Sequence, residues 1–340
     1  MARRILGQFL TNALRQTHLP QAVVLYMGRK QAVRLARAAR MAAGAPIRIM
    51  RIVYHLGAHC TDEERLIRCL LKNRSVLAEQ GIHVPAPTRY RRLLRDTAVQ
   101  LRGAPASVET QALVIGQIMD DDTAGRLILS WDSFLAFPQW ALRGRLYGFA
   151  GERIRAFTQI FPHIEAEFFL AIRNPATWLP ALYEKQRNSR SYEEFVEGTD
   201  ISQLRWSDVV SQIIAENPGA PLTIWCDEDT PLIWPEVLQA VGGFSDDTRL
   251  EETDELLSLI MAGDGLTRLR NYLASHPPAS VSQRRRVVSA FLDKFAMSER
   301  ITMEFAMPGW TQETVDRLTR TYLEDIEVIR DMPGVTLISP

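Results

Sequence analysis

One turn near the start of the chain combines residue types that could bind an anion. It reads HLGAHCTDEE over residues 55–64, between an apolar run over residues 52–56 and a helical pattern that begins at Asp62. A strand, a glycine turn and a helix N-terminus together direct free backbone N–H groups and the positive end of the helix dipole at a ligand. The order of residues therefore favours a phosphate or sulfate site, although the lysine and the further glycine of a GxxxxGK[ST] phosphate loop are missing.

The acids of this turn support a second interpretation. Thr61 and Glu64 fit the T-x-x-E capping box, in which each side chain bonds the backbone N–H of the other residue and the helix end is satisfied internally. A carboxylate about 4 Å from a bound phosphate also costs roughly 4 kcal/mol at an effective dielectric near 20. On this interpretation the turn is structural, and the sequence leaves both interpretations open.

The turns after two other expected strands carry further candidates. Arg173 follows the apolar run over residues 167–172, and a guanidinium at the end of a buried strand can pair with a phosphate or a carboxylate. Its structural alternative is a salt bridge to one of the acids at residues 62–64. Asp132 follows the run over residues 126–130 and is a candidate general base for a substrate hydroxyl. Its structural alternative is to cap the next turn.

Composition and spacing argue against several other kinds of site. The chain carries 40 basic and 40 acidic side chains, which excludes nucleic-acid binding through net charge alone. His55 and His59 form no recognised zinc spacing with Cys60 or Cys69, so we expect no metal site. Three cysteines indicate no disulfide framework and suit a reducing cytoplasm. The run Arg284–Arg286 indicates a solvated helix face.

Strand-like and helical segments alternate along the chain. Short apolar runs predict strands over residues 52–56, 82–84, 126–130, 167–172, 222–226 and 335–339. Helical spacing predicts helices over residues 62–80, 107–119, 148–161, 174–183, 280–295 and 312–330. The alternation predicts an α/β fold of three layers around a mostly parallel sheet, with ligands at the carboxyl ends of the strands. We expect no transmembrane segment, because no window reaches the ~18 apolar residues that one needs.

Charge is distributed unevenly between the two ends of the chain. Residues 1–49 contain eight arginines, one lysine and no acidic residue. This change in charge composition predicts a basic N-terminal extension over residues 1–49 and one α/β domain over residues 50–340. We expect the domain to be helical from about residue 232. The extension has three interpretations. Translation starts at Met50, or the extension is a basic arm for an anionic surface or partner, or it is a targeting segment.

Two stretches, IVYHLGAHCTDEERLIRCLLKNRSVLAEQGIHVP and FFLAIRNPATWLPALY, resemble bacterial sulfotransferase-like proteins, which have a P-loop fold. In that family an H-[IL]-G-x-x-K-[TS]-G-T-[TS] loop binds the 5′-phosphosulfate end of the donor 3′-phosphoadenosine 5′-phosphosulfate (PAPS). An R-[DN]-P stretch, followed by a serine, binds the donor's 3′-phosphate. The resemblance implies sulfuryl transfer to a hydroxyl or amine acceptor such as a glycan, with His59 or Asp132 as the catalytic base. It places the donor on Gly57, Ala58, His59, Cys60, Thr61 and Arg173.

The chain departs from the family's motifs at several positions. Cys60 replaces the family's catalytic lysine, acids at residues 62–64 replace its glycine and hydroxyl residues, and Ala181 replaces its serine. Two further hypotheses follow. In the first, the fold is catalytically inactive and binds a protein partner or a glycan. In the second, Cys60 is a nucleophile toward a less anionic donor. The sequence leaves open whether a remote lysine, such as Lys72 or Lys185, replaces the missing one.

Overall fold

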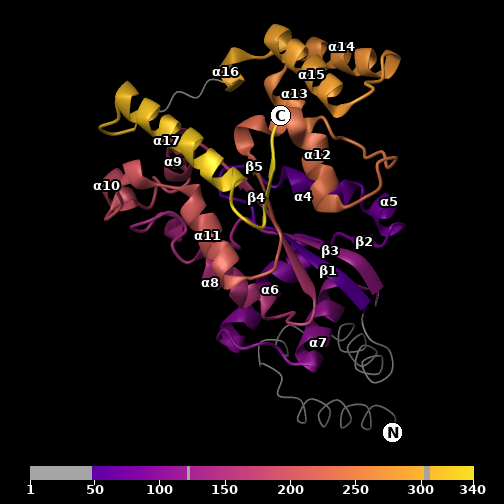
Figure 1. Ribbon diagram of the computed structural model, residues 1–340, viewed down its shortest axis with the longest axis vertical. Helices are drawn as coiled ribbons and strands as arrows, with labels where there is room; N and C mark the ends of the chain where they lie inside the picture. The colour runs from indigo at the N-terminus through magenta and orange to yellow at the C-terminus, as the bar shows by residue number, and fades with distance from the viewer. Residues whose placement is uncertain (1–47, 121–122, 302–306) are drawn as a thin grey trace.

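The computed structural model describes residues 48–120, 123–301 and 307–340. In this part of the chain six strands form one parallel sheet in the order β2-β3-β1-β4-β5-β6 (Figure 1). The strands are β1 (Arg48–His55), β2 (Ile82–His83), β3 (Thr123–Ser130), β4 (Glu165–Ile172), β5 (Leu222–Cys226) and β6 (Val335–Ile338). The six expected strands and the three-layer α/β fold are therefore confirmed.

Helices connect successive strands. Those after β1 to β4 are α4 (Arg65–Lys72), α5 (Arg74–Ala78), α6 (Pro87–Leu101), α7 (Val108–Ile118), α8 (Ala150–Thr158), α9 (Pro175–Glu184), α10 (Tyr192–Val196) and α11 (Trp206–Glu216). Those after β5 are α12 (Thr230–Gly242), α13 (Glu255–Ile260), α14 (Gly263–Ser275), α15 (Val281–Phe295), α16 (Ser298–Ile301) and α17 (Gln312–Arg330). Short 3₁₀ helices span Pro138–Trp140, Ile201–Gln203 and Asp227–Asp229. The expected extension over residues 1–49 falls almost wholly outside the described residues, and β1 begins at Arg48.

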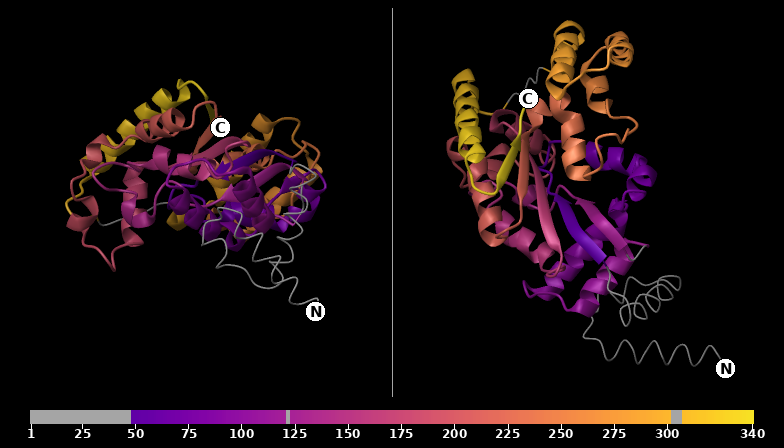
Figure 2. Two further views of the ribbon diagram at one scale, coloured as in Figure 1. Left: turned by 90° about the horizontal axis from the view of Figure 1, so that it is seen from below. Right: turned by 45° about the vertical axis from the view of Figure 1, so that its right-hand side comes forward.

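The sheet is buried on both faces, which is why its strands are continuously apolar in sequence. Alternate residues of β1 face opposite layers: Tyr54 contacts one hydrophobic cluster and Val53 the other. The first cluster joins the sheet to α6, α7, α8, α9, α11 and α17. The second joins the sheet to α4, α5 and α12. Figure 2 shows these two layers on either side of the sheet.

Helices α13 to α15 form a small unit with an apolar cluster of its own, beyond α12 (Figures 1 and 2). Arg284 and Arg285 on α15 both contact the Glu236 carboxylate of α12, and Arg285 also donates to the Ser339 carbonyl at 2.8 Å. The expectation of a solvated face is wrong for these two arginines, because they attach α15 to α12 and to the C-terminus. Arg286 is exposed, as expected.

Candidate functional site

The candidate site lies where the carboxyl ends of β3, β1 and β4 meet. His55, the last residue of β1, pairs with Ser130 of β3 and with Phe169 of β4. From β1 the chain first builds the β2-β3 side of the sheet and then crosses to β4, so the direction of strand addition reverses at β1. In open α/β sheets, ligands bind at the carboxyl ends of the strands at such a reversal.

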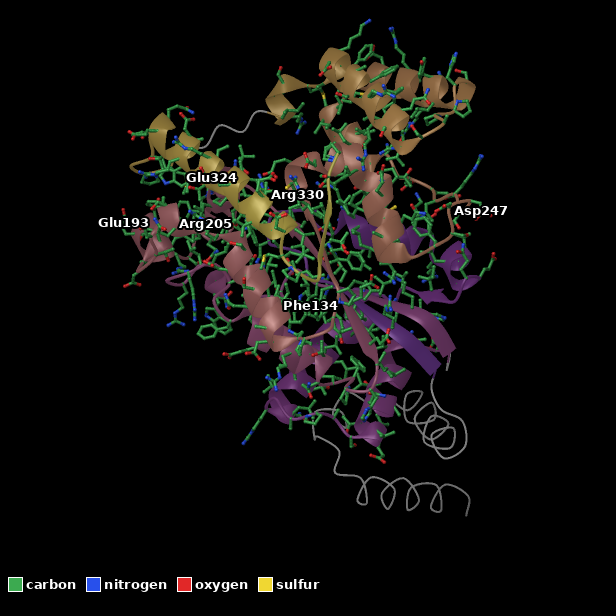
Figure 3. The ribbon with its side chains drawn as sticks, in the orientation of Figure 1. Phe134, Glu193, Arg205, Asp247, Glu324 and Arg330 are labelled. Carbon is green, nitrogen blue, oxygen red and sulfur yellow. The ribbon has the colours of Figure 1, made fainter. Side chains whose placement is uncertain are left out.

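The turns after β1 and β3 touch at Gly57. This residue has φ +57°, and a Cβ atom added to it would lie 3.0 Å from the Cα of Asp132. The contact explains why a glycine stands here, and it brings Asp132 to the anion loop, which we define as residues 56–64. Phe134, which follows the β3 turn and is labelled in Figure 3, is fully buried. Its ring contacts those of Tyr54 and Phe157 edge-on, with centroids 5.6 Å and 5.1 Å apart.

Several residues of the anion loop adopt a left-handed backbone. Cys60, Glu63 and Glu64 have φ values of 63°, 50° and 64°, which non-glycine residues adopt rarely and usually under external constraint. Within the described residues, the backbone N–H groups of Cys60, Asp62 and Glu63 donate no hydrogen bond to the protein. The constrained loop therefore keeps backbone donors available for an anion.

Buried side chains provide that constraint. Trp178 Nε1 donates to the His59 carbonyl at 2.8 Å, and an Arg173 Nη1–H donates to the Cys60 carbonyl. The His59 N–H donates to the Tyr147 hydroxyl at 3.0 Å. The Thr61 hydroxyl donates to the Ala58 carbonyl at 2.7 Å. The loop is thus held by α9, by the segment before α8 and by its own threonine.

His59 is held as a neutral side chain. The Tyr147 hydroxyl lies 2.7 Å from His59 Nδ1 and also accepts the His59 backbone N–H. His59 Nε2 is buried and has no partner within the described residues. Burial lowers the pKa of His59 to about 4. A neutral imidazole that is buried and hydrogen-bonded to Tyr147 is poorly suited to be the base that the resemblance implies.

The expected capping box does not form. Thr61 bonds its own loop, and Glu64 has a left-handed backbone with no side-chain capping bond. The helix α4 begins at Arg65 rather than at Asp62, and the Asp62 carboxylate accepts the N–H of Leu66 at 3.0 Å. The T-x-x-E spacing is present, but Glu63 and Glu64 have a left-handed backbone, so Glu64 precedes the helix instead of lying in its first turn.

The two other acids of the loop pair with cations from different elements. Glu63 Oε1 accepts from Lys185 Nζ at 2.7 Å, and Glu64 bonds the Arg91 guanidinium of α6. Arg91 also donates from Nη2 to the Ser130 carbonyl at 3.0 Å. Both carboxylates are thus paired, which weakens the repulsion that the sequence predicted between the loop and a phosphate.

Lys185 brings a cation to the loop from the turn after α9. Burial lowers its pKa, but the Glu63 hydrogen bond and negative charges nearby, including that of Asp132, outweigh burial and raise it. Asp132 is exposed and its Oδ1 accepts from the Ser133 hydroxyl at 3.2 Å. Lys185 and Glu63 therefore form an ion pair at the anion loop, within electrostatic range of Asp132. Lys72, in contrast, pairs with Glu252 away from the loop.

Arg173 is directed inward rather than toward a ligand. It is only 8% exposed, its Nε donates to the Thr177 hydroxyl at 3.0 Å, and its Nη1 bonds the Cys60 carbonyl. The acceptors in these two bonds are neutral. Position 181 contributes an alanine on α9, which offers no hydroxyl. Arg173 and Ala181 do not fit the binding of a 3′-phosphate.

Cys60 is expected to be unreactive. It is buried, and burial raises the pKa of its thiol to about 11, which leaves almost no thiolate at neutral pH. Burial likewise raises the pKa values of the Cys69 and Cys226 thiols, to about 11 and 12. We predict that the folded protein at pH 8 reacts with a thiol-specific disulfide reagent at least about 100-fold more slowly than a free cysteine. Absorbance of the released thiolate measures this, with denaturant-unfolded protein as the control. Rapid labelling of Cys60 in the folded protein would restore the nucleophile hypothesis.

No group of three or more His, Cys, Asp or Glu side chains in residues 48–120, 123–301 and 307–340 could hold a metal ion. No helix in the same ranges is long and apolar enough to cross a membrane.

Comparisons with known proteins give no family assignment. No family model, no curated protein and no solved structure matches this chain. The function must therefore be argued from the geometry of the site.

Proposed function

We propose that this chain is a sulfotransferase-type enzyme that moves a sulfuryl group from PAPS to a hydroxyl or amine of an acceptor. The observation that carries the proposal is the position of Lys185, whose ammonium bonds Glu63 of the anion loop at 2.7 Å and interacts with Asp132. The sulfotransferase loop has a lysine where this chain has Cys60. Lys185 supplies the same charge from the turn after α9.

Each group at the loop has a role in this reaction. A bond forms between the acceptor oxygen or nitrogen and sulfur, while the bond between sulfur and the 5′-phosphate oxygen breaks. Asp132 accepts the acceptor's proton, and its exposure lets an acceptor reach it. Lys185 stabilises the charge that develops on the departing phosphate oxygen. The free N–H groups of Cys60, Asp62 and Glu63 bind the 5′-phosphate.

Lys185 can exchange Glu63 for the donor at little cost. Both side chains are nearly half exposed, and an exposed ion pair contributes about 0.2–1 kcal/mol. A hydrogen bond between an ammonium and a phosphate in a partly desolvated site contributes about 1.5–3 kcal/mol. The balance favours the donor, and the released Glu63 carboxylate lies in solvent.

Substitution of Lys185 tests the proposal. We predict that Lys185→Ala weakens binding of 3′-phosphoadenosine 5′-phosphate, the product of the donor, by about 10- to 100-fold, measured by calorimetry at low salt. Lys72→Ala is the matched control, because Lys72 also pairs with an exposed glutamate but lies away from the loop. It should change affinity less than about twofold. Asp132→Asn should retain binding and lose transfer.

A second function, a binding protein without catalysis, is favoured by one observation. Arg173 already bonds the loop's own Cys60 carbonyl, so the 3′-phosphate loses the partner that the family provides. The calorimetric experiment separates the two functions. No binding at millimolar nucleotide, or equal losses in Lys185→Ala and Lys72→Ala, would contradict the enzyme and leave the binding protein.

A further inference from the structure

A cavity of about 340 Å³ lies between the segment that follows β3 and the residues on either side of α10. Its walls are Gln139, Trp140, Leu142, Arg143, Arg190 and Glu197. Gln186, the residue after Lys185, donates to the Pro138 carbonyl at 3.1 Å, so the turn that carries Lys185 contacts the 3₁₀ helix that carries Trp140. The volume lies within the range of about 300–1,000 Å³ that small-molecule sites occupy.

Trp140 presents an aromatic surface to solvent. Its side chain is 49% exposed, which is unusual for so large an apolar group. The ring packs edge-on against Phe137, with centroids 5.6 Å apart, so its orientation is supported from one side. Its indole N–H donates no hydrogen bond within the described residues. An exposed, supported indole with a free donor suits a flat ligand that is apolar on one face and polar at its edge.

The charged residues of the cavity indicate an anionic ligand. Arg143 is exposed, and its guanidinium forms no ion pair or hydrogen bond with another described residue. Arg190 is oriented by bonds from Nη1 to the Gln139 carbonyl at 3.2 Å and from Nη2 to the Glu194 carbonyl, which leave its Nε–H free in the described part of the chain. Arg143 can offer paired donors to a carboxylate or sulfate, and Arg190 adds its Nε–H and its positive charge. Glu197 can accept from a hydroxyl.

We propose that this cavity binds an acidic sugar residue, with the ring's C–H face on Trp140, its carboxylate or sulfate on Arg143 and Arg190, and a hydroxyl on Glu197. A sugar acid combines the flat C–H face, the anion and the hydroxyls that these side chains match. The claim that this sugar is the acceptor of sulfuryl transfer rests on the proposed function. The claim that the cavity binds it does not. On the proposed function, the hydrogen bond between Gln186 and Pro138 brings the cavity wall to the turn of Lys185, and the bound acidic oligosaccharide is the acceptor.

Calorimetric titration with a trisaccharide of galacturonic acid tests the cavity without any donor. We expect saturable binding below about 1 mM, and at least about tenfold weaker binding of the neutral trisaccharide maltotriose. Trp140→Ala and Arg143→Ala should each weaken binding of the acidic trisaccharide by about tenfold or more. Phe149→Ala and Arg145→Ala are the matched controls, because both side chains are exposed on the same segment but do not line this cavity. They should change affinity less than about twofold.

The outcomes separate this inference from the donor proposal. Loss of binding in Trp140→Ala and Arg143→Ala alone supports the cavity, even if the nucleotide does not bind. Equal binding of the neutral trisaccharide, equal losses in the control variants, or no saturation at millimolar ligand would each overturn it. A competition experiment with inorganic sulfate tests whether the cavity recognises only the anion. If sulfate bound as tightly as the trisaccharide, the proposal of a sugar site would be overturned.

Discussion

Arg173→Ala is expected to lower the free energy of unfolding by about 3–5 kcal/mol. The guanidinium is buried and bonds the Thr177 hydroxyl and the Cys60 carbonyl, so its removal takes a bond from the half-buried hydroxyl and leaves the buried carbonyl without this donor. Arg173 also opposes the rise in the pKa of Asp227, which burial increases to about 7. Without the arginine, this carboxyl group loses a stabilising positive charge.

Urea unfolding followed by tryptophan fluorescence measures the effect. Arg173→Lys retains the charge but not the planar set of donors, so an intermediate loss of stability is expected. Arg143→Ala removes an exposed guanidinium and should stay within about 0.5 kcal/mol of the unmutated chain. If Arg173→Ala were as stable as that control and yet lost nucleotide affinity, Arg173 would be free to bind the donor, contrary to its role in holding the loop.

Much of the fold could be predicted because its sheet is parallel and buried on both faces. Each strand is then a short apolar run, and the run at residues 222–226 matches β5 at both ends. Helix α6 has no counterpart among the helices predicted from the sequence. Proline is tolerated in the first turn of a helix, and here Pro87 is the first residue of α6.

The candidate site was only partly predictable for a geometric reason. Local patterns identified the anion loop, Asp132 and Arg173, because each follows a strand whose carboxyl end can be located in sequence. They did not determine which way the side chains point: His59, Cys60 and Arg173 lie buried. The ion pair between Glu63 and Lys185 joins residues 122 positions apart, so no spacing rule could reveal it. Lys185 was one of two lysines left open by the sequence, and the contact with Glu63 distinguishes it from Lys72.

The second large effect is expected at Asp325, a residue of α17 far from the anion loop in sequence. The N-cap of α11, Arg205, forms no side-chain capping bond. Instead the buried Asp325 carboxylate accepts the N–H groups of Trp206 at 2.6 Å and of Ser207 at 3.1 Å, and it also accepts the Ser207 hydroxyl. A carboxylate at a helix N-terminus satisfies the free donors and interacts favourably with the helix dipole. Asp325→Ala should therefore lower the free energy of unfolding by about 2–4 kcal/mol.

The same substitution is expected to disturb the turn after β4. Trp206 Nε1 donates to the Arg173 carbonyl at 2.8 Å, so the start of α11 supports the residue that holds the anion loop. Asp325→Asn keeps an acceptor oxygen and should lose less than half as much stability as Asp325→Ala. Glu324→Ala, at the exposed neighbouring residue labelled in Figure 3, is the control and should change the urea midpoint little. Equal midpoints for Asp325→Ala and Glu324→Ala would show that α11 does not depend on this carboxylate. If the midpoint falls as expected, protection of the Trp206 and Ser207 amides from hydrogen exchange should fall with it, because those two N–H groups lose their acceptor.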